Sequence, residues 1–356
     1  MIEIDGSVGE GGGQVLRSAL SLSCLTGKGF RIVNIRKNRQ KPGLMHQHLV
    51  AVRSAARISS AEVVGDTLGS SQLSFMPGVV RSGDYSFDIG TAGSATLVLQ
   101  AVIPALLAAH GKSGVTVTGG THVPFSPSWN YFAEVFWPAI TRLGVRGDVG
   151  LGSYGFYPRG GGRIRCSVEP LAVSSALSLR ERGRLLRVTG TSAVGNLSLS
   201  IAERQLHAAA LLLEKELGRE LPIRVETKEL RVFGQGTFIF LRCEYEHAVA
   251  GFTALGERGK PAERVGEEAA LELLEHHRTG MPVDPHLADQ LVLYLARAEA
   301  PSVFATSRIT THLETNLLVA GYFLDLTTGI TGEIGGPGTV SIKPGGGTWR
   351  GAHPGE

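Results

Sequence analysis

The residues whose types and spacing could do chemistry are concentrated in residues 306–323, TSRITTHLETNLLVAGYF. The run before them, residues 302–305, is short, apolar and partly β-branched, which predicts a strand. Leu313, Leu317 and Ala320 then recur at the spacing of one helix face. The stretch therefore predicts a strand followed by a helix.

A histidine lies at the start of this predicted helix. Thr311 and Glu314 have the spacing of a capping box, which predicts Thr311 as the N-cap and His312 as the first helical residue. The positive end of the helix dipole disfavours the imidazolium, so the ring would keep a free lone pair, and the same end can bind a phosphoryl group. His312 is therefore either an exposed polar residue or a nucleophile, and both interpretations stay open at this point.

Size and composition favour two structural units. The chain has 356 residues, 42% hydrophobic content and 48 glycines, which indicates an α/β or α+β protein with many tight turns. No apolar run is long enough to span a membrane and the first residues lack a signal-peptide pattern, so we expect a cytoplasmic protein. Cys24, Cys166 and Cys243 lie far apart without metal-ligand spacing, and their odd number argues against a disulfide framework.

Positive charge is concentrated near the N-terminus. Residues 11–61 contain nine Lys or Arg and no Asp or Glu, whereas the rest of the chain has 26 basic and 32 acidic residues. A solvated basic face would explain part of this pattern. An acid-free stretch of this length beside an acidic remainder favours a surface for phosphates.

Glycine-rich or polar turns precede several predicted helices. Residues 6–13 form a glycine turn before a helix over 14–25, and residues 90–94 precede a helix over 95–109. The first turn matches neither the nucleotide P-loop nor the dinucleotide fingerprint, so it is either a phosphate site or a structural turn. Polar residues 284–286 likewise precede a predicted helix over 288–296. This rhythm predicts a repeated β/α unit, interrupted near 171–276 by a β-α-β-β segment of different texture.

Six separate motifs are spread along the chain: EGGGQVLR (10–17), NIRKNRQKPGLMHQHL (34–49), GTAGS (90–94), GFYPRGGG (155–162), LADQ (287–290) and HLETN (312–316). Together and in this order, they resemble the motifs of the RNA 3′-terminal phosphate cyclase family. The resemblance runs from residue 1 to about 343. It implies an α/β (α+β) fold of three repeated units, each a four-stranded sheet with two helices, plus a small α/β domain inserted before the third unit. We expect the first two units in 1–170, the insertion in 171–276, the third unit in 277–343 and a flexible tail in 344–356.

The resemblance also implies a reaction. The family uses ATP and a divalent metal to convert an RNA 3′-phosphate to a 2′,3′-cyclic phosphate. A histidine takes AMP from ATP and releases pyrophosphate, AMP passes to the RNA 3′-phosphate, and the neighbouring 2′-OH displaces it. The implied partners are ATP and RNA 3′-phosphate ends, with no membrane.

Residue by residue, the resemblance places His312 as the nucleophile and Glu10 beside the metal, Mg²⁺ or Mn²⁺. The residues implied to hold ATP are Gln100, Pro127, His286, Leu287, Ala288, Asp289 and Gln290. The residues implied to face the phosphates and the RNA end are Arg17, Arg36, Arg39, Lys41 and Gln47. Taken singly, each basic residue could equally belong to a solvated face. His286 departs from the family, because relatives can carry an aromatic ring there for base stacking, and Glu314 replaces an apolar residue.

Two other functions share related scaffolds. Non-catalytic ribosome-assembly factors of this family lack the nucleophilic histidine, which is present here as His312. An enolpyruvyl-transferase-like enzyme would need residues for phosphoenolpyruvate that we cannot place in this chain. The sequence therefore favours the cyclase.

Overall fold

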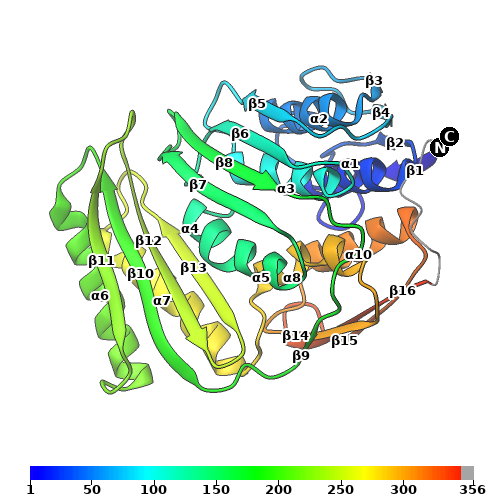
Figure 1. Cartoon of the computed structure of the whole chain (residues 1–356). Helices are drawn as coiled ribbons and strands as arrows, with labels where there is room; N and C mark the ends of the chain where they lie inside the picture. Colours follow the sequence, from blue (N-terminus) through cyan, green and yellow to red (C-terminus); the bar gives the residue numbers. More distant parts are fainter. Residues whose placement is uncertain (346–356) are drawn as a thin grey trace.

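One topology recurs in three four-stranded sheets of the computed structural model, which describes residues 1–345. In each sheet the first two strands in sequence are parallel and joined by a crossover, the second pairs antiparallel with the fourth, and the fourth with the third. Figure 1 shows helices α1, α3 and α10 between these sheets. The α/β fold with repeated sheet units is thus confirmed.

The first unit begins at the N-terminus. Helix α1 ends where Gly27 takes a left-handed conformation (φ 70°) and its N–H donates to Ser23 O at 2.9 Å, a common way to close a helix. Its elements are β1 (Ile2–Asp5), α1 (Gln14–Thr26), β2 (Phe30–Val33), α2 (His46–Ser59), β3 (Glu62–Val64) and β4 (Leu73–Met76).

The first helix of the second unit, α3, is capped by a side chain at its N-terminus: Ser94 Oγ accepts the Leu97 N–H at 3.2 Å. Residues 129–142 form three consecutive helical segments, one of them a π-helix, with Pro138 at the start of the last. The strand β7 was not predicted, since its glycine-rich sequence lacks a β pattern. The elements are β5 (Asp84–Asp88), α3 (Ala95–Leu106), β6 (Ser113–Gly119), α4 (Trp129–Tyr131), η1 (Phe132–Phe136), α5 (Trp137–Arg142), β7 (Gly147–Ser153) and β8 (Gly162–Val168).

The third unit is interrupted by other residues. Its first strand, β9, pairs with β14, although more than a hundred residues separate them. The helix predicted over 288–296 is wrong in its start and its continuity: Asp284 caps a first helix that ends at Gln290, and a second follows. The elements are β9 (Ser178–Leu179), α8 (Pro285–Gln290), α9 (Val292–Leu295), β14 (Ser302–Thr306), α10 (Thr311–Phe323), β15 (Leu326–Gly332) and β16 (Gly338–Pro344).

A fourth sheet forms the interruption and has a different strand order, β11-β10-β12-β13. Helices α6 and α7 cover one of its faces, on the left of Figure 1. This sheet includes β13, which the sequence analysis did not predict. The elements are β10 (Leu185–Gly195), α6 (Leu199–Leu217), β11 (Ile223–Leu230), β12 (Gly236–Tyr245), β13 (Val249–Leu255) and α7 (Ala262–Thr279).

These pairings bear on the predicted unit boundaries. Residues 178–179 of β9 lie in the third sheet, although we expected the insertion to begin at 171, before the third unit. We propose limits near Leu185 and Thr279, because these limits keep each sheet within one unit. Of the predicted tail, Pro344 ends β16, and residues 346–356 lie outside the described residues.

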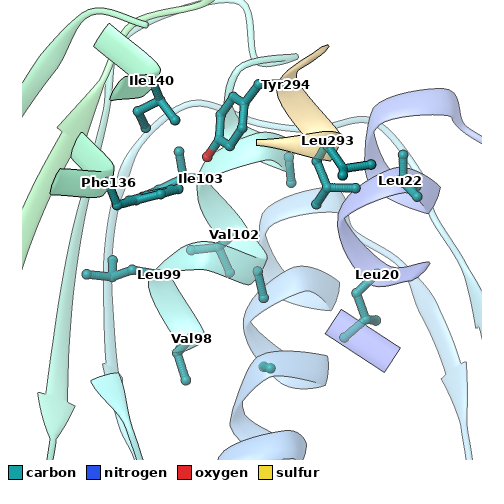
Figure 2. Close-up of a cluster of buried hydrophobic side chains, with 14 of the residues drawn as sticks. Leu20, Leu22, Val98, Leu99, Val102, Ile103, Phe136, Ile140, Leu293 and Tyr294 are labelled. Carbon is teal, nitrogen blue, oxygen red and sulfur yellow. The ribbon is translucent and has the colours of Figure 1, made fainter. Parts of the chain in front are cut away.

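The core joins the three units through their helices. Leu20 of α1, Val102 of α3 and Tyr294 of α9 lie in one buried cluster with Phe136 of η1 (Figure 2). Fully burying such a side chain contributes about 1.5–3 kcal/mol, so this cluster fixes how the helices lie relative to one another. Across residues 1–345, none of the helices is both long and apolar enough to cross a membrane.

Candidate active site

A cleft of about 1650 Å³ opens between the repeated units and the small sheet. Twelve of the fourteen predicted site residues line it: Glu10, Arg17, Arg36, Arg39, Lys41, Gln47, Gln100, Pro127, His286, Asp289, Gln290 and His312. The other two do not, because Leu287 and Ala288 are 5% and 0% exposed and face the core from α8. Residues spread over nearly the whole chain are thus brought to one cavity.

His312 lies one residue further into its helix than predicted. The N-cap of α10 is Thr310, whose Oγ1 accepts the Leu313 N–H at 3.1 Å. The predicted capping box of Thr311 and Glu314 is therefore wrong. The backbone of Ile309 pairs with a neighbouring loop, and this contact fixes the extended chain up to that point, so the helix starts directly afterwards. His312 still lies in the first turn.

Two side chains position the imidazole of His312. Its Nδ1 contacts Gln14 Oε1, and Gln14 Nε2 donates to Asp289 Oδ2 at 2.5 Å. An amide oxygen only accepts hydrogen bonds, so Nδ1 carries the proton and Nε2 keeps the free lone pair. The relay from Asp289 through Gln14 thus selects the tautomer in which Nε2 keeps its lone pair.

The surroundings of His312 hold its ring neutral. Burial first, and then the positive charge of Arg17 and the nearby His286 and Arg39, lower its pKa to about 4. The direction agrees with the prediction, and burial and cationic neighbours account for it. Glu10 Oε2 lies 3.6 Å from Nδ1, yet Glu10 is also ion-paired with Arg39, which compensates its charge.

Asp289 and Arg17 form an electrostatic pair beneath the cleft. Burial raises the pKa of Asp289 to about 6, partly offset by the hydrogen bond from Gln14. Burial also lowers the pKa of the Arg17 guanidinium to about 10, and Asp289 acts against that shift. Arg17 therefore presents a poorly solvated positive charge at the cleft, where an anion would gain more than at the surface.

Five of the seven predicted ATP-holding residues line the cleft between α3, α8 and the loop around Pro127. Gln100 Nε2 and Gln290 Oε1 are buried there, and neither has a hydrogen-bond partner within residues 1–345. His286 is exposed and meets the ring of Tyr131 edge-on at a centroid distance of 6.1 Å. A hydrogen-bond donor and a hydrogen-bond acceptor, both without a partner in the same cavity, suit a planar heteroaromatic ligand that has an acceptor and a donor of its own.

The residues predicted to face the phosphates differ in how far their side chains are already hydrogen-bonded within the protein. Arg36 Nη1 donates to the carbonyl oxygens of Lys41 and Gly43 at 2.7 and 2.9 Å, so it also holds its own loop. Gln47 Oε1 accepts the backbone N–H of Ser94 at 3.1 Å and joins α2 to the second glycine turn. The side chain of Lys41 is exposed at the cleft.

The sequence analysis assigned no role to several residues of the cleft. Gln14 contacts His312, and Asn316 receives a hydrogen bond from Ser18 at 2.5 Å and donates to Asp289 O at 2.9 Å. His48 is buried, its Nδ1 accepts the Met45 N–H at 3.2 Å, and burial lowers its pKa to about 3. Gln14 and Asn316 belong to the motifs EGGGQVLR and HLETN, so those motifs were the signal that could have identified them.

A metal ion would find few protein ligands. Over residues 1–345 there is no group of three or more His, Cys, Asp or Glu side chains that could hold one. Glu10, at the cleft surface, has its carboxylate next to His312. This set suits Mg²⁺ or Mn²⁺, which bind through one or two carboxylates together with substrate phosphates and water.

Comparisons with known proteins agree on one family. The sequence model of "RNA 3′-terminal phosphate cyclase" matches residues 8–330. A protein of that name from Methylococcus capsulatus is 46% identical over 331 residues, which cover 91% of each chain. Its namesake from Methanopyrus kandleri is 45% identical over 97% of this chain and 99% of its own, and that from Sulfolobus acidocaldarius is 45% identical over 94% and 97%.

Proposed function

The chain belongs to the RNA 3′-terminal phosphate cyclase family, and on this premise we propose that it converts an RNA 3′-phosphate to a 2′,3′-cyclic phosphate with ATP. One observation carries the proposal: the side chain of His312 is neutral, keeps a free lone pair on Nε2, and lies in a large cleft that is also lined by several Arg and Lys side chains. A non-catalytic assembly factor would have no use for such a group. We place the reaction in the cytoplasm.

In the first step, Nε2 of His312 attacks the α-phosphorus of ATP. An N–P bond forms, the bond from this phosphorus to the bridging oxygen breaks, and pyrophosphate leaves with the electron pair. The pKa of about 4 keeps the lone pair available at neutral pH. The proton remains on Nδ1, which keeps donating its hydrogen bond to Gln14 Oε1, so the imidazolium that develops is stabilised by the relay to Asp289.

In the second step, an oxygen of the RNA 3′-phosphate attacks the phosphorus of the histidine-bound AMP. The N–P bond breaks, its electrons return to Nε2, and the RNA carries the anhydride RNA(3′)pp(5′)A. In the third step, the vicinal 2′-OH attacks the 3′-phosphorus, AMP leaves, and the hydroxyl proton passes to solvent. The covalent route replaces a poor leaving group with AMP and divides a difficult substitution into easier ones.

ATP fits the part of the cleft that contains the orphaned amide atoms. Gln100 Nε2 can donate to a ring nitrogen of adenine, and Gln290 Oε1 can accept from its amino group. Pro127 and His286 would cover the faces of the base. Asp289 contributes through Gln14, whereas Leu287 and Ala288 support α8 from the core and contact no ligand in this proposal.

The charged residues would neutralise the phosphates. Glu10 would hold Mg²⁺ or Mn²⁺, which when bound neutralises the charge on the ATP phosphates. Arg17 faces the reacting centre from beneath, and Arg36, Arg39, Lys41 and Gln47 form the side of the cleft that receives the RNA end. Phosphoryl transfer leaves a protein mainly this positioning and charge compensation.

The direct test is transfer of label from [α-³²P]ATP to the protein. We expect acid-labile, alkali-stable label on the wild-type chain, as for a phosphoramidate, and none on His312→Ala or His312→Asn. The matched control is His110→Ala, an exposed histidine outside the cleft. Cyclic RNA ends formed by His312→Ala with ATP would contradict the proposal, and so would cyclisation by the wild type without a nucleoside triphosphate.

A further inference from the structure

One aromatic ring at the rim of the cleft is left in solvent. Phe125 lines the cavity, yet its side chain is fully exposed, at 103% of the reference area. A phenylalanine side chain gains free energy when it is removed from water, so this exposed ring in the cleft can contribute affinity to a ligand that covers it. The other exposed phenylalanine, Phe233, lies outside the cleft and packs against Arg159.

The backbone holds this ring in an unusual conformation. Phe125 has φ 60°, in the left-handed region that bulky residues rarely occupy. Its loop is fixed on both sides: Ser126 Oγ donates to Val123 O at 3.0 Å, and Thr96 Oγ1 donates to Pro127 O at 2.8 Å. An unfavourable conformation that the surroundings enforce is typical of functional sites.

The position of the ring distinguishes between the two proposed substrates. The orphaned atoms Gln100 Nε2 and Gln290 Oε1 are buried and mark where a nucleoside can be enclosed. ATP is finite and can lie entirely within the cleft, whereas an RNA chain must leave it on the 5′ side of the reacting phosphate. A fully exposed ring at the rim suits the strand that leaves. Arg39 and Lys41, also exposed, line the same cleft.

We propose, on the basis of the cyclase function above, that Phe125 is a stacking platform for a base of the RNA strand upstream of the terminal nucleotide. An aromatic ring beside cationic side chains is the usual arrangement for single-stranded nucleic acid, and stacking tolerates any base because each has a π-face. Phe125 thus gives the enzyme affinity for a continuing strand over a mononucleotide.

The test measures AMP transfer from the pre-adenylylated enzyme to 3′-phosphorylated RNAs under single-turnover conditions. One RNA has all its bases, and three others have an abasic site at the first, second or third nucleotide before the end. We expect the wild type to react with at least one abasic RNA about tenfold more slowly than with the intact RNA, as loss of one stacked base predicts.

The variant Phe125→Asn removes the ring and keeps the loop, because asparagine tolerates the left-handed conformation. It should react with intact and abasic RNA at the same reduced rate, and Phe125→Trp should restore the preference for the intact RNA. Phe233→Asn, the matched control, should behave as the wild type.

Three outcomes would overturn the inference. These are retention of the base preference by Phe125→Asn, absence of any preference in the wild type, and slower self-adenylylation of Phe125→Asn, which would place the ring on ATP instead. Failure of the wild type to modify any RNA would overturn the proposed function itself, and the stacking role with it.

Discussion

Gln14 provides the sharpest test of the relay that positions the nucleophile. Replacing it with methionine preserves the length of this buried side chain (8% exposed) but removes both its contacts, to His312 Nδ1 and to Asp289 Oδ2. The imidazole then loses the acceptor that fixes its tautomer. Gln14 is thus a positioning residue, acting through His312.

The magnitude follows from the value of such hydrogen bonds. A hydrogen bond that involves a charged group contributes about 1.5–3 kcal/mol, and about 1.4 kcal/mol corresponds to a tenfold change in rate. We therefore expect Gln14→Met to slow self-adenylylation about 10- to 150-fold. The KM for ATP should change less, because Gln14 acts on the orientation of the ring.

Gln14→Glu should change the pH dependence instead. A carboxylate beside Nδ1 favours the imidazolium, so the pKa of His312 should rise from about 4 toward or above its ordinary value near 6.5. The wild-type chain should keep its labelling rate as the pH falls from 8 to about 5, since the ring stays neutral. The variant should lose activity as the pH falls below neutrality.

The assay is single-turnover labelling with [α-³²P]ATP between pH 5 and pH 8. Gln235→Met, an exposed glutamine next to the small sheet, is the matched control and should label as the wild type does. Wild-type rates for Gln14→Met would refute the relay. An unchanged pH profile for Gln14→Glu, in a variant with wild-type thermal stability, would refute the tautomer argument.

Three further results are expected. Lys41→Ala and Arg39→Ala should each raise the KM for RNA by about three- to tenfold at moderate salt and leave self-adenylylation largely intact; equal loss in both assays would place them on ATP. Burial lowers the pKa values of His48, His122 and His276 to about 3, so the unfolded chain binds more protons and stability should fall as the pH drops from about 6.5 toward 3. The raised pKa values of the buried Asp284 and Asp289 oppose part of this trend. A Tm that stays constant between pH 7 and pH 4.5 would contradict this. An RNA whose last nucleotide has a 3′-phosphate but no 2′-OH should stop at the adenylylated end RNA(3′)pp(5′)A, which should accumulate and be visible on a gel. If this RNA stays unmodified while the matching ribose RNA is cyclised, the AMP-transfer step is excluded.

The sequence was sufficient for the features that depend on local pattern. The strand at 302–305, the helix bearing His312 and the glycine turns before α1 and α3 were all predicted within a few residues. The N-cap was misplaced because Thr310 and Thr311 are adjacent and equally able to cap. Only the pairing of Ile309 with a distant loop decides between them.

Long-range packing explains what the sequence could not predict. Gln14 and His312 are 298 positions apart and meet because α1 packs against α10. Strand β9 likewise pairs with β14 across the inserted sheet. Neither contact follows from periodicity, because residue spacing along one helix or strand contains no information about its neighbours. The same limit explains why Leu287 and Ala288 were placed at the ligand while their side chains face the core.

The arrangement of the repeats explains why a single one could not carry this site. The proposed nucleophile, His312, is at the start of α10 in the third unit. Gln14, which we propose positions it, is at the start of α1 in the first, and Gln100 is in the middle of α3 in the second. These helices meet because each unit buries its helical face against the others (Figure 1). The N-terminal ends of α1 and α10 line the cleft, where their unpaired N–H groups and a neutral imidazole can both face phosphate. The same packing that makes the core thus creates the site, and a substitution that shifted α1 relative to α10 would disturb the chemistry even without touching the cleft.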